Sequence, residues 1–344
     1  MAHQPEGLRP AIATMSLGTA GIHPLKRKLQ AAQGVGFRGI ELFWDDLLAE
    51  THETGQGLLK TAQSLRSYCD NLGLEIISLQ PFRNYDGIRD KELHDQRVDE
   101  FKAWLMLAGV LGAGFIGVPS TIKADEQSHT GDAEDIARDL AELAALARPY
   151  NIRIAYENLC FGAHVRTWQQ AWEAISHPLS SSDVGFLVDT FNLAGSVYAD
   201  PSIPDGKVVG GIERFRRSLD DLVGTIPMSR IPFIQLADGE RMTAPIGPDH
   251  EWMNDCLNAK MAWSRNARLF PFEPKGYLPV LAIVKALVRA GWSGWVSMEV
   301  FSRSTAQEGE ETMKAHAKRA WRSWQKMATL IGDLPDGGVE STSS

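Results

Sequence analysis

Cysteines and long apolar runs are scarce in this sequence. Its 344 residues include three cysteines, Cys69, Cys160 and Cys256, and none belongs to a Cys-x-x-Cys pair. Widely spaced cysteines in odd number argue against a disulfide framework and against a cysteine-bound zinc. No apolar stretch reaches the roughly 18 residues that a membrane span needs. The opening residues, MAHQPEGLRP, lack the basic and apolar regions of a secretory signal, so we expect a cytoplasmic protein with no membrane partner.

The sequence also lacks an excess of basic residues, because its formal net charge is −8. A main partner made of nucleic acid would need a basic footprint, and this class of partner is therefore excluded. Local basic side chains could still bind a small anionic substrate. The composition, 44% hydrophobic and 23% charged, is that of a globular protein with a large core, and it is compatible with a homo-oligomer.

Eight short apolar runs alternate with longer amphipathic stretches. Most of the runs are continuous, as expected for strands buried on both faces of a parallel sheet. They are residues 11–17, 39–44, 75–80, 115–120, 152–158, 184–190, 232–238 and 294–300. The alternation predicts a single-domain (β/α)8 TIM barrel over residues 1–333, with a polar, glycine-rich tail at 334–344. A doubly wound open sheet is the alternative, but no glycine-rich phosphate fingerprint follows the first run.

Polar side chains stand where four consecutive runs end. They are Glu157, Asp189, Gln235 and Glu299. Barrel enzymes place their chemistry at the carboxyl ends of the strands, so these side chains should converge. Three carboxylates and an amide oxygen suit a hard divalent ion, Mg²⁺ or Mn²⁺, with Co²⁺ or Zn²⁺ less suited. The alternative is that some of them are ion-paired or solvated residues of the rim.

Further candidates lie in the segments that follow the runs. Arg83 follows the third run, and Arg268 lies in a long segment, 242–274, that exceeds a normal connection and is a candidate functional loop. Both arginines could hold a substrate carboxylate, although each, like Arg265, could equally be an ordinary surface arginine. His164 is a candidate general base, and Glu41, in the second run, a candidate acid. A lone histidine is more often structural.

At these residues the chain resembles the xylose isomerase-like barrels, and within them the 3-dehydroshikimate dehydratases. The segments LQPFRNYDG, WSRNAR and GYLPV carry the resemblance most specifically, and similar segments extend over roughly residues 11 to 305. The resemblance implies a divalent metal on Glu157, Asp189, Gln235 and Glu299, and substrate contacts from Arg83, Ser264 and Arg268. The implied reaction converts 3-dehydroshikimate to protocatechuate with loss of water.

Two positions depart from the pattern of many relatives. Asn192 stands where a histidine often follows the strand-six aspartate by three residues, and Leu159 replaces a histidine found in some relatives. The identity of the general base is therefore open, with His164 as the candidate; Glu41 or a metal-bound water could act as the acid.

Three other functions share the scaffold. A sugar isomerase or epimerase would use the same metal with Glu157 and Glu299 as paired acid and base, but a neutral sugar gives Arg83 and Arg268 nothing to bind. A metabolite sensor would have no chemical reason to keep all four ligands. An abasic-site endonuclease would need several histidine ligands and a basic groove, which the sequence lacks.

Overall fold

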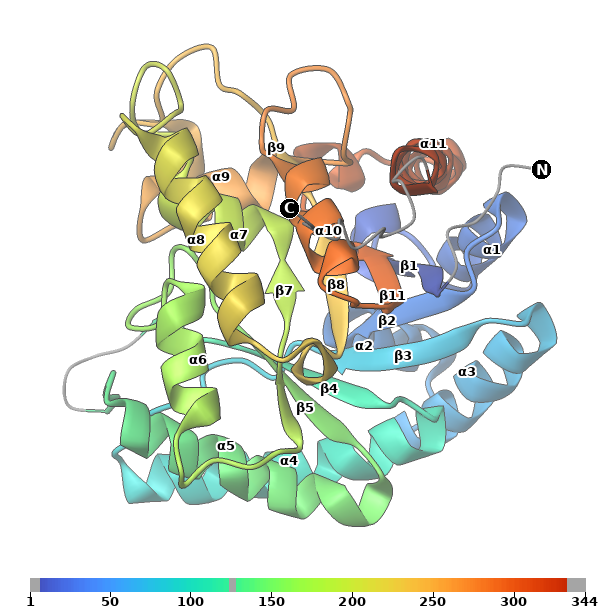
Figure 1. Ribbon diagram of the computed structural model, residues 1–344. Coiled ribbons are helices and arrows are strands. Elements are labelled where there is room, and N and C mark those ends of the chain that lie inside the picture. The colour runs from blue at the N-terminus through green and yellow to red at the C-terminus, as the bar shows by residue number, and fades with distance from the viewer. Residues whose placement is uncertain (1–6, 124–127, 333–344) are drawn as a thin grey trace, which may run out of the picture.

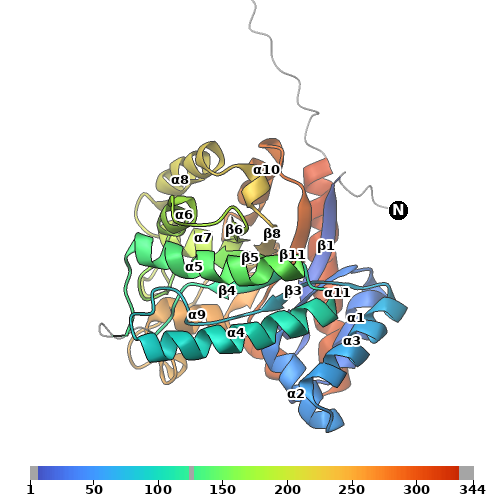
Figure 2. The ribbon, with the colours of Figure 1, turned by 90° about the horizontal axis from the view of Figure 1, so that it is seen from below.

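Each strand of the main sheet is parallel to its neighbours, and the sheet closes on itself (Figures 1 and 2). The computed structural model describes residues 7–123 and 128–332, so the expected tail at 334–344 lies outside the described residues. The strands are β1 (Leu8–Ala13), β2 (Gly39–Phe43), β3 (Glu75–Gln80), β4 (Phe115–Pro119), β5 (Arg153–Glu157), β6 (Val184–Phe186), β7 (Val188–Asp189), β8 (Phe233–Leu236) and β11 (Gly294–Met298).

One interrupted segment closes the ring. β6 and β7 are two pieces of the run predicted at 184–190, separated at Leu187; β6 pairs with β5, and β7 pairs with β8. An open doubly wound sheet would leave two free edges, and this closure rules it out. The fold is the predicted TIM barrel.

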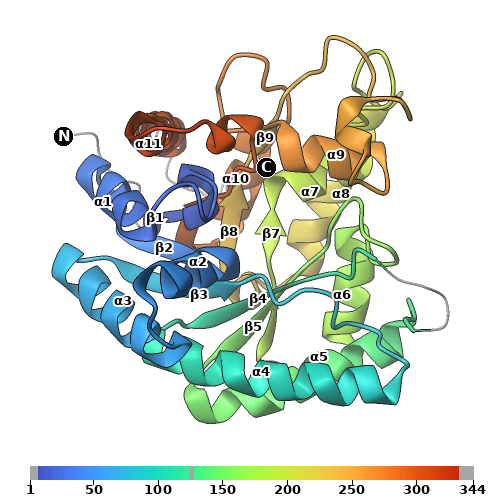
Figure 3. The same cartoon turned by 180° about the vertical axis from the view of Figure 1, so that it is seen from behind.

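Helices cover the outside of the barrel (Figures 1 and 3). They are α1 (Leu25–Val35), α2 (Trp44–Thr54), α3 (Leu58–Leu72), α4 (Lys91–Leu111), α5 (Ala133–Ala147), α6 (Trp168–Ser176), α7 (Thr190–Val197), α8 (Gly211–Thr225), α9 (Ala259–Asn266), α10 (Val280–Arg289) and α11 (Glu310–Gly332). Asp90 and Asp132 cap α4 and α5, and Thr167 and Gln170 form a capping box on α6. No helix in the described ranges is long and apolar enough to cross a membrane.

The barrel interior has an apolar lower layer and a polar upper layer, and the alternation of side chains along the strands explains both. Ala155, Leu187, Phe233 and Trp295 belong to a small buried cluster distinct from the core that packs against the helices. Side chains two positions apart on a strand face the same side. Glu157, Asp189 and Gln235 follow the first three of these residues by two positions, and Glu299 follows Trp295 by four. The four polar side chains therefore face the barrel interior above the apolar layer.

The first strand differs from the prediction of 11–17. β1 pairs with β11 from Leu8 and ends at Ala13, and residues Thr14–Leu17 form a 3₁₀ helix. Side chains of this segment, and not its backbone, make the hydrogen bonds to the neighbouring chain. Thr14 Oγ1 accepts from the Phe43 amide. Ser16 Oγ donates to the Met298 carbonyl and accepts from the Val300 amide. The chain therefore turns where apolar character alone suggested that the strand continues.

The long segment after β8 is ordered and tied to the barrel at both ends. β9 (Asp238–Gly239) pairs antiparallel with β10 (Arg268–Leu269), and α9 lies between them in the sequence (Figure 3). Asp238 Oδ1 accepts from the Tyr277 and Leu278 amides, which fixes the returning chain. The Trp263 indole packs so closely on Gly239 that a Cβ there would lie 2.1 Å from Cζ2. α9 therefore has a fixed place beside the barrel mouth.

Candidate active site

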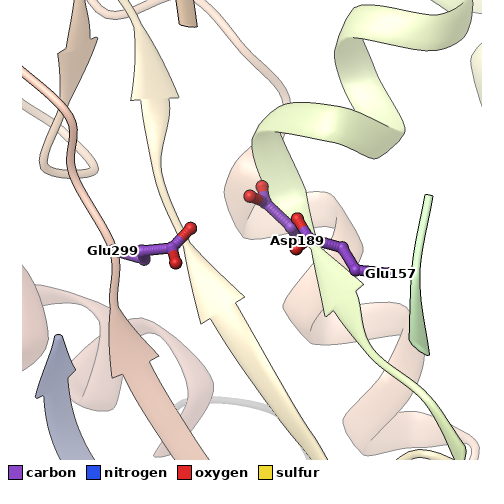
Figure 4. A group of neighbouring side chains, drawn as sticks. All are labelled: Glu157, Asp189 and Glu299. Carbon is purple, nitrogen blue, oxygen red and sulfur yellow. The ribbon is translucent and has the colours of Figure 1, made fainter. Parts of the chain in front are cut away.

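Three buried carboxylates meet at the carboxyl ends of the barrel strands (Figure 4). Glu157 ends β5, Asp189 ends β7, and Glu299 directly follows β11. One carboxylate oxygen from each lies within 4.8 Å of the others, so the group could hold a metal ion. The structure thus brings together three of the four residues expected to bind metal, each from a different strand.

Gln235, the fourth expected ligand, lies among carboxylates that fix its amide. Its Nε2 donates to Glu41 Oε2 and to Glu299 Oε1, both at 3.0 Å. Because these neighbours are acceptors, the amide nitrogen must face them, and Gln235 Oε1 is left buried with no hydrogen-bond partner in the described part of the chain. A buried oxygen without a donor is costly in a folded protein, and a cation would satisfy it.

Glu41 lies in the same buried layer. Besides Gln235, its Oε2 accepts from Gln80 Nε2 at 2.7 Å and from Ser78 Oγ at 3.3 Å. Gln80 Nε2 also lies 3.2 Å from Glu299 Oε1. Glu41 therefore joins two amides that both contact Glu299. The sequence analysis did not single out Gln80 for this role, although it too is the last residue of a buried strand.

Burial dominates the electrostatics of this cluster. Desolvation raises the pKa of Glu157 and of Glu299 well above the usual carboxyl range. Repulsion from Asp189 raises the pKa of both further, and Arg268 opposes the rise. Burial also raises the pKa of Glu41 to about 7. Only an added positive charge would let all these groups ionise together at neutral pH.

Arg268 already supplies one positive charge. Its Nη1 lies 2.6 Å from Asp189 Oδ2 and 3.1 Å from Glu299 Oε2, and the residue is only 2% exposed. Its Nε and Nη2 donate to Ser264 Oγ at 3.2 and 3.1 Å. The guanidinium carbon also lies 4.5 Å from the ring centre of Phe191 and 5.0 Å from that of Phe301. The guanidinium is thus locked in place by acids, a hydroxyl and two rings.

Asn192 joins two of the acids. Its Nδ2 donates to Glu157 Oε1 at 2.7 Å and to Asp189 Oδ2 at 3.1 Å, while its Oδ1 accepts from the Cys160 amide. From the sequence, Asn192 stood out only as the residue that replaces a histidine of many relatives. The D-x-x-N spacing was the available signal, because Asp189 caps α7 and the third residue of the helix then faces back toward the cap.

A cavity opens above the carboxylates. The predicted residues Arg83, Glu157, Ser264, Arg268 and Glu299 line it. The other lining residues are Phe43, Gln80, Pro81, Pro119, Ile122, Leu159, Phe161, Arg265 and Phe301. Asp189, Gln235 and Glu41 are buried but do not line this cavity. The cavity thus has an acidic floor, apolar walls and basic side chains.

His164 is not brought to the cavity. It lies between β5 and α6 against Gly131, where a Cβ would come within 2.9 Å of the histidine Cβ, and its Nε2 is buried without a described partner. None of the histidines in the described ranges lines the cavity. The role expected for His164 would therefore require a water relay or a movement of its loop.

A buried hydrogen-bond network that the sequence analysis missed holds the loop that carries Arg83. Asp86 accepts from Thr121 Oγ1 and Tyr156 OH, both at 2.7 Å. Asp139 Oδ2 accepts from the Gly87 amide at 2.7 Å. Gly87 has φ +77°, and a Cβ there would clash with the Thr130 carbonyl, so this turn requires glycine. The loop is thus fixed to α5 and to the residue before Glu157.

Comparisons with known proteins agree with this geometry. A family model described as a xylose isomerase-like TIM barrel matches residues 29–324. A 3-dehydroshikimate dehydratase of Neurospora crassa is 36% identical over 343 residues, which cover 94% of each chain. A 3-dehydroshikimate dehydratase of Pseudomonas aeruginosa is 29% identical, and the match spans 91% of this chain but 43% of that protein.

Solved structures give the same fold. A fusion protein of a xylose isomerase-like TIM barrel with 4-hydroxyphenylpyruvate dioxygenase has a TM-score of 0.71 at 26% identity, covering 94% of this chain and 43% of that one. The chain thus spans less than half of that protein. A structure of IOLI protein with a bound zinc atom has a TM-score of 0.69 at 19% identity, covering 93% and 98% of the two chains. The second likeness concerns the fold alone.

Proposed function

We propose, given that the chain belongs to the xylose isomerase-like TIM barrel family, that it converts 3-dehydroshikimate to protocatechuate with loss of water. The observation that carries the proposal is the cavity itself: a floor with buried carboxylates lies below arginine side chains. This polarity fits a small ring that bears a carboxylate at one end and a ketone and hydroxyl at the other. The 36% identity to a dehydratase, over nearly the whole chain, supports the same substrate.

Glu157, Asp189, Gln235 and Glu299 would hold the metal. Three carboxylates and the unpartnered Gln235 Oε1 form an oxygen-only donor set, which favours Mg²⁺ or Mn²⁺ over softer ions such as Co²⁺ and Zn²⁺. When bound, the ion supplies a Lewis acid for the ketone oxygen. Glu41 is better placed as a positioning residue than as an acid, because it orients Gln235 and Gln80 from below the cavity.

Ser264 and Arg268 would contact the ketone end of the substrate, and not the carboxylate that the sequence suggested for Arg268, because Arg268 is buried and paired with Asp189 and Glu299. Ser264 Oγ accepts two hydrogen bonds from Arg268, so its own O–H remains free to donate toward the cavity. Both donors would stabilise negative charge that develops on the ketone oxygen. Arg83 would meet the carboxylate end, because 40% of its side chain is exposed and its one ion pair among the described residues is a long contact of 3.5 Å to Asp45.

The reaction needs a base for the proton on the ring carbon next to the ketone. The electron pair released forms an enolate. The hydroxyl on the following carbon leaves as hydroxide and takes up a proton to give water, while the enolate returns to the ketone. Loss of a further ring proton and uptake of one proton by the ketone oxygen then give the aromatic ring with its new hydroxyl. Glu157 and Glu299 line the cavity, whereas His164 does not, so the geometry favours a carboxylate over His164 as the base.

Absorbance in the near ultraviolet tests the proposal. Protein supplied with Mn²⁺ or Mg²⁺ is mixed with 3-dehydroshikimate, beside a chelated sample. An aromatic product that forms only with metal supports the dehydratase. No product, with keto sugars isomerised instead, would favour the sugar isomerase or epimerase. Binding of the substrate without turnover would favour the metabolite sensor.

A further inference from the structure

We infer that Arg265, treated above as an ordinary surface arginine, binds the substrate carboxylate together with Arg83 at the mouth of the cavity. This inference rests on the proposed function and names a specificity residue that the sequence resemblance does not include. Its first support is position, since Arg265 and Arg83 line the same cavity from α9 and from the loop after β3.

The second support is the state of each guanidinium. Three arginines line the cavity, but Arg268 is buried and already paired with Asp189 and Glu299. Arg265 is exposed, and within the described part of the chain its side chain makes one hydrogen bond, from Nη1 to the Asp255 carbonyl at 3.1 Å. A carbonyl leaves the charge of Arg265 uncompensated. Arg83 and Arg265 are therefore the two lining cations that are still able to take an anionic partner.

The third support is the shape of the substrate. In 3-dehydroshikimate the carboxylate lies directly across the ring from the hydroxyl that neighbours the ketone. When the ketone and that hydroxyl face the carboxylates on the floor, the ring points its own carboxylate away from Arg268 and toward the mouth. The exposed guanidinium groups of Arg83 and Arg265 are placed there, and two forked donors can share one carboxylate.

The substrate carboxylate keeps its charge throughout the dehydration, so Arg265 should stabilise the bound substrate and the transition state equally. Arg265→Gln is therefore expected to raise KM about 10- to 100-fold with kcat within a few-fold, the range of a lost charge-assisted hydrogen bond. Arg265→Lys should recover part of the loss. Arg241→Gln, at an exposed arginine outside the cavity, is the matched control and should change neither constant.

The deciding measurement is binding of protocatechuate and of catechol, which differ only in the carboxylate, to Mn²⁺-supplied protein by calorimetry. The unsubstituted chain should prefer protocatechuate, and Arg265→Gln should reduce that preference at least about tenfold, while Arg241→Gln should not. An unchanged preference, or equal weakening of both ligands, would overturn the assignment of Arg265 while turnover of 3-dehydroshikimate leaves the proposed function standing. No turnover by the unsubstituted chain would overturn both.

Discussion

The cavity floor holds more negative charge than its neighbours neutralise. Glu157, Asp189 and Glu299 are all buried, and among the described residues the ion pairs of this cluster come from Arg268 alone. The Glu157 carboxylate accepts a hydrogen bond from the neutral amide of Asn192. Burying a charge without a counter-charge costs several kcal/mol, which folding alone would not favour. The three carboxylates therefore form a site that a bound cation would stabilise.

Replacing Glu157 should separate function from stability. In Glu157→Gln, turnover is expected to fall by at least about 100-fold, because a ligand is lost. The metal-free protein should at the same time melt a few degrees higher, since Gln removes the cost of burying an acid beside Asp189 and Glu299, by about 1–2 kcal/mol. Turnover assays and thermal unfolding in chelator measure the two effects. A lower melting temperature in chelator would contradict the electrostatic argument.

His164 provides the sharpest test of the base. Because it does not line the cavity, His164→Ala is expected to keep turnover within a few-fold of the unsubstituted chain. A general base would show a loss of roughly 10²–10⁴. Steady-state kinetics across pH 6 to 9 should be compared for both proteins. A loss of that size, with metal binding unchanged by calorimetry, would restore His164 as the base.

Sequence reasoning located most of the site at this scale, for a physical reason. A charged residue at the end of a continuous apolar strand of a barrel is expected to lie at the barrel mouth, and the structure does bring Glu157, Asp189 and Glu299 together there. It could not foresee that Arg268 pairs with two of them, because that contact joins residues 79 and 31 positions apart. Nor could it choose between the exposed Arg265 and the buried Arg268, since side-chain exposure depends on how α9 packs.

Among the elements, the loop between β3 and α4 carries Arg83, which we propose to bind the substrate carboxylate. The loop is held by groups of other elements, Asp139 on α5 and Tyr156 on β5. Asp139 also lies 3.6 Å from His94 Nε2, and burial raises its pKa to about 7. The position of Arg83 is thus set by a buried acid that is distant in the sequence.

Asp139 should make stability depend on pH. Its folded pKa of about 7 exceeds the ordinary value of 3.8, so ionisation costs free energy of folding, and this cost develops as the pH rises from about 4 to 7. The unfolding free energy of the unsubstituted chain relative to Asp139→Asn, measured by chemical denaturation, should fall over that range and level off above it, by about 4 kcal/mol in all. A pH-independent difference would contradict this account.

Removing the acceptor altogether should have a different effect. Asp139→Ala leaves the Gly87 and Ile88 amides without their acceptor, so we expect a loss of about 1–3 kcal/mol in unfolding free energy. A raised KM with little change in kcat should accompany it, because the loop that holds Arg83 is loosened. Chemical denaturation measures the unfolding free energy and steady-state kinetics measures KM, with Asp139→Asn as the matched control. An unchanged KM would mean that Arg83 is positioned by other contacts.

The elements themselves were mostly predictable, and the exceptions follow from side chains. Continuous apolar runs gave all eight barrel positions. The first strand was misplaced because Thr14 and Ser16 hydrogen-bond to the backbone of neighbouring strands. The internal order of segment 239–276 was not foreseen, since the pairing of β9 with β10 and the packing of Trp263 on Gly239 join distant residues.

For the whole molecule, metal and folding should be coupled. A ligand at about 100 times its Kd stabilises the folded state by about 2.7 kcal/mol, so adding Mn²⁺ to chelator-treated protein should raise the melting temperature by about 5 °C. Glu157→Gln should show little of this rise. Differential scanning fluorimetry with and without Mn²⁺ measures both. Equal melting of the unsubstituted chain in the two conditions would exclude the metal site proposed here.

The contact between Trp263 and Gly239 determines how this enzyme could be recombined with another barrel. Ser264 and Arg265 are the two residues after Trp263, so these two residues, which we propose to contact the substrate, are both positioned by the packing of Trp263 on Gly239 of β9. A chimaera that exchanged α9 alone would replace Trp263 but keep Gly239, so the packing that positions Ser264 and Arg265 would be lost. The exchangeable unit therefore runs from β9 through Tyr277, and a designer who respects that boundary could transfer substrate recognition as one piece.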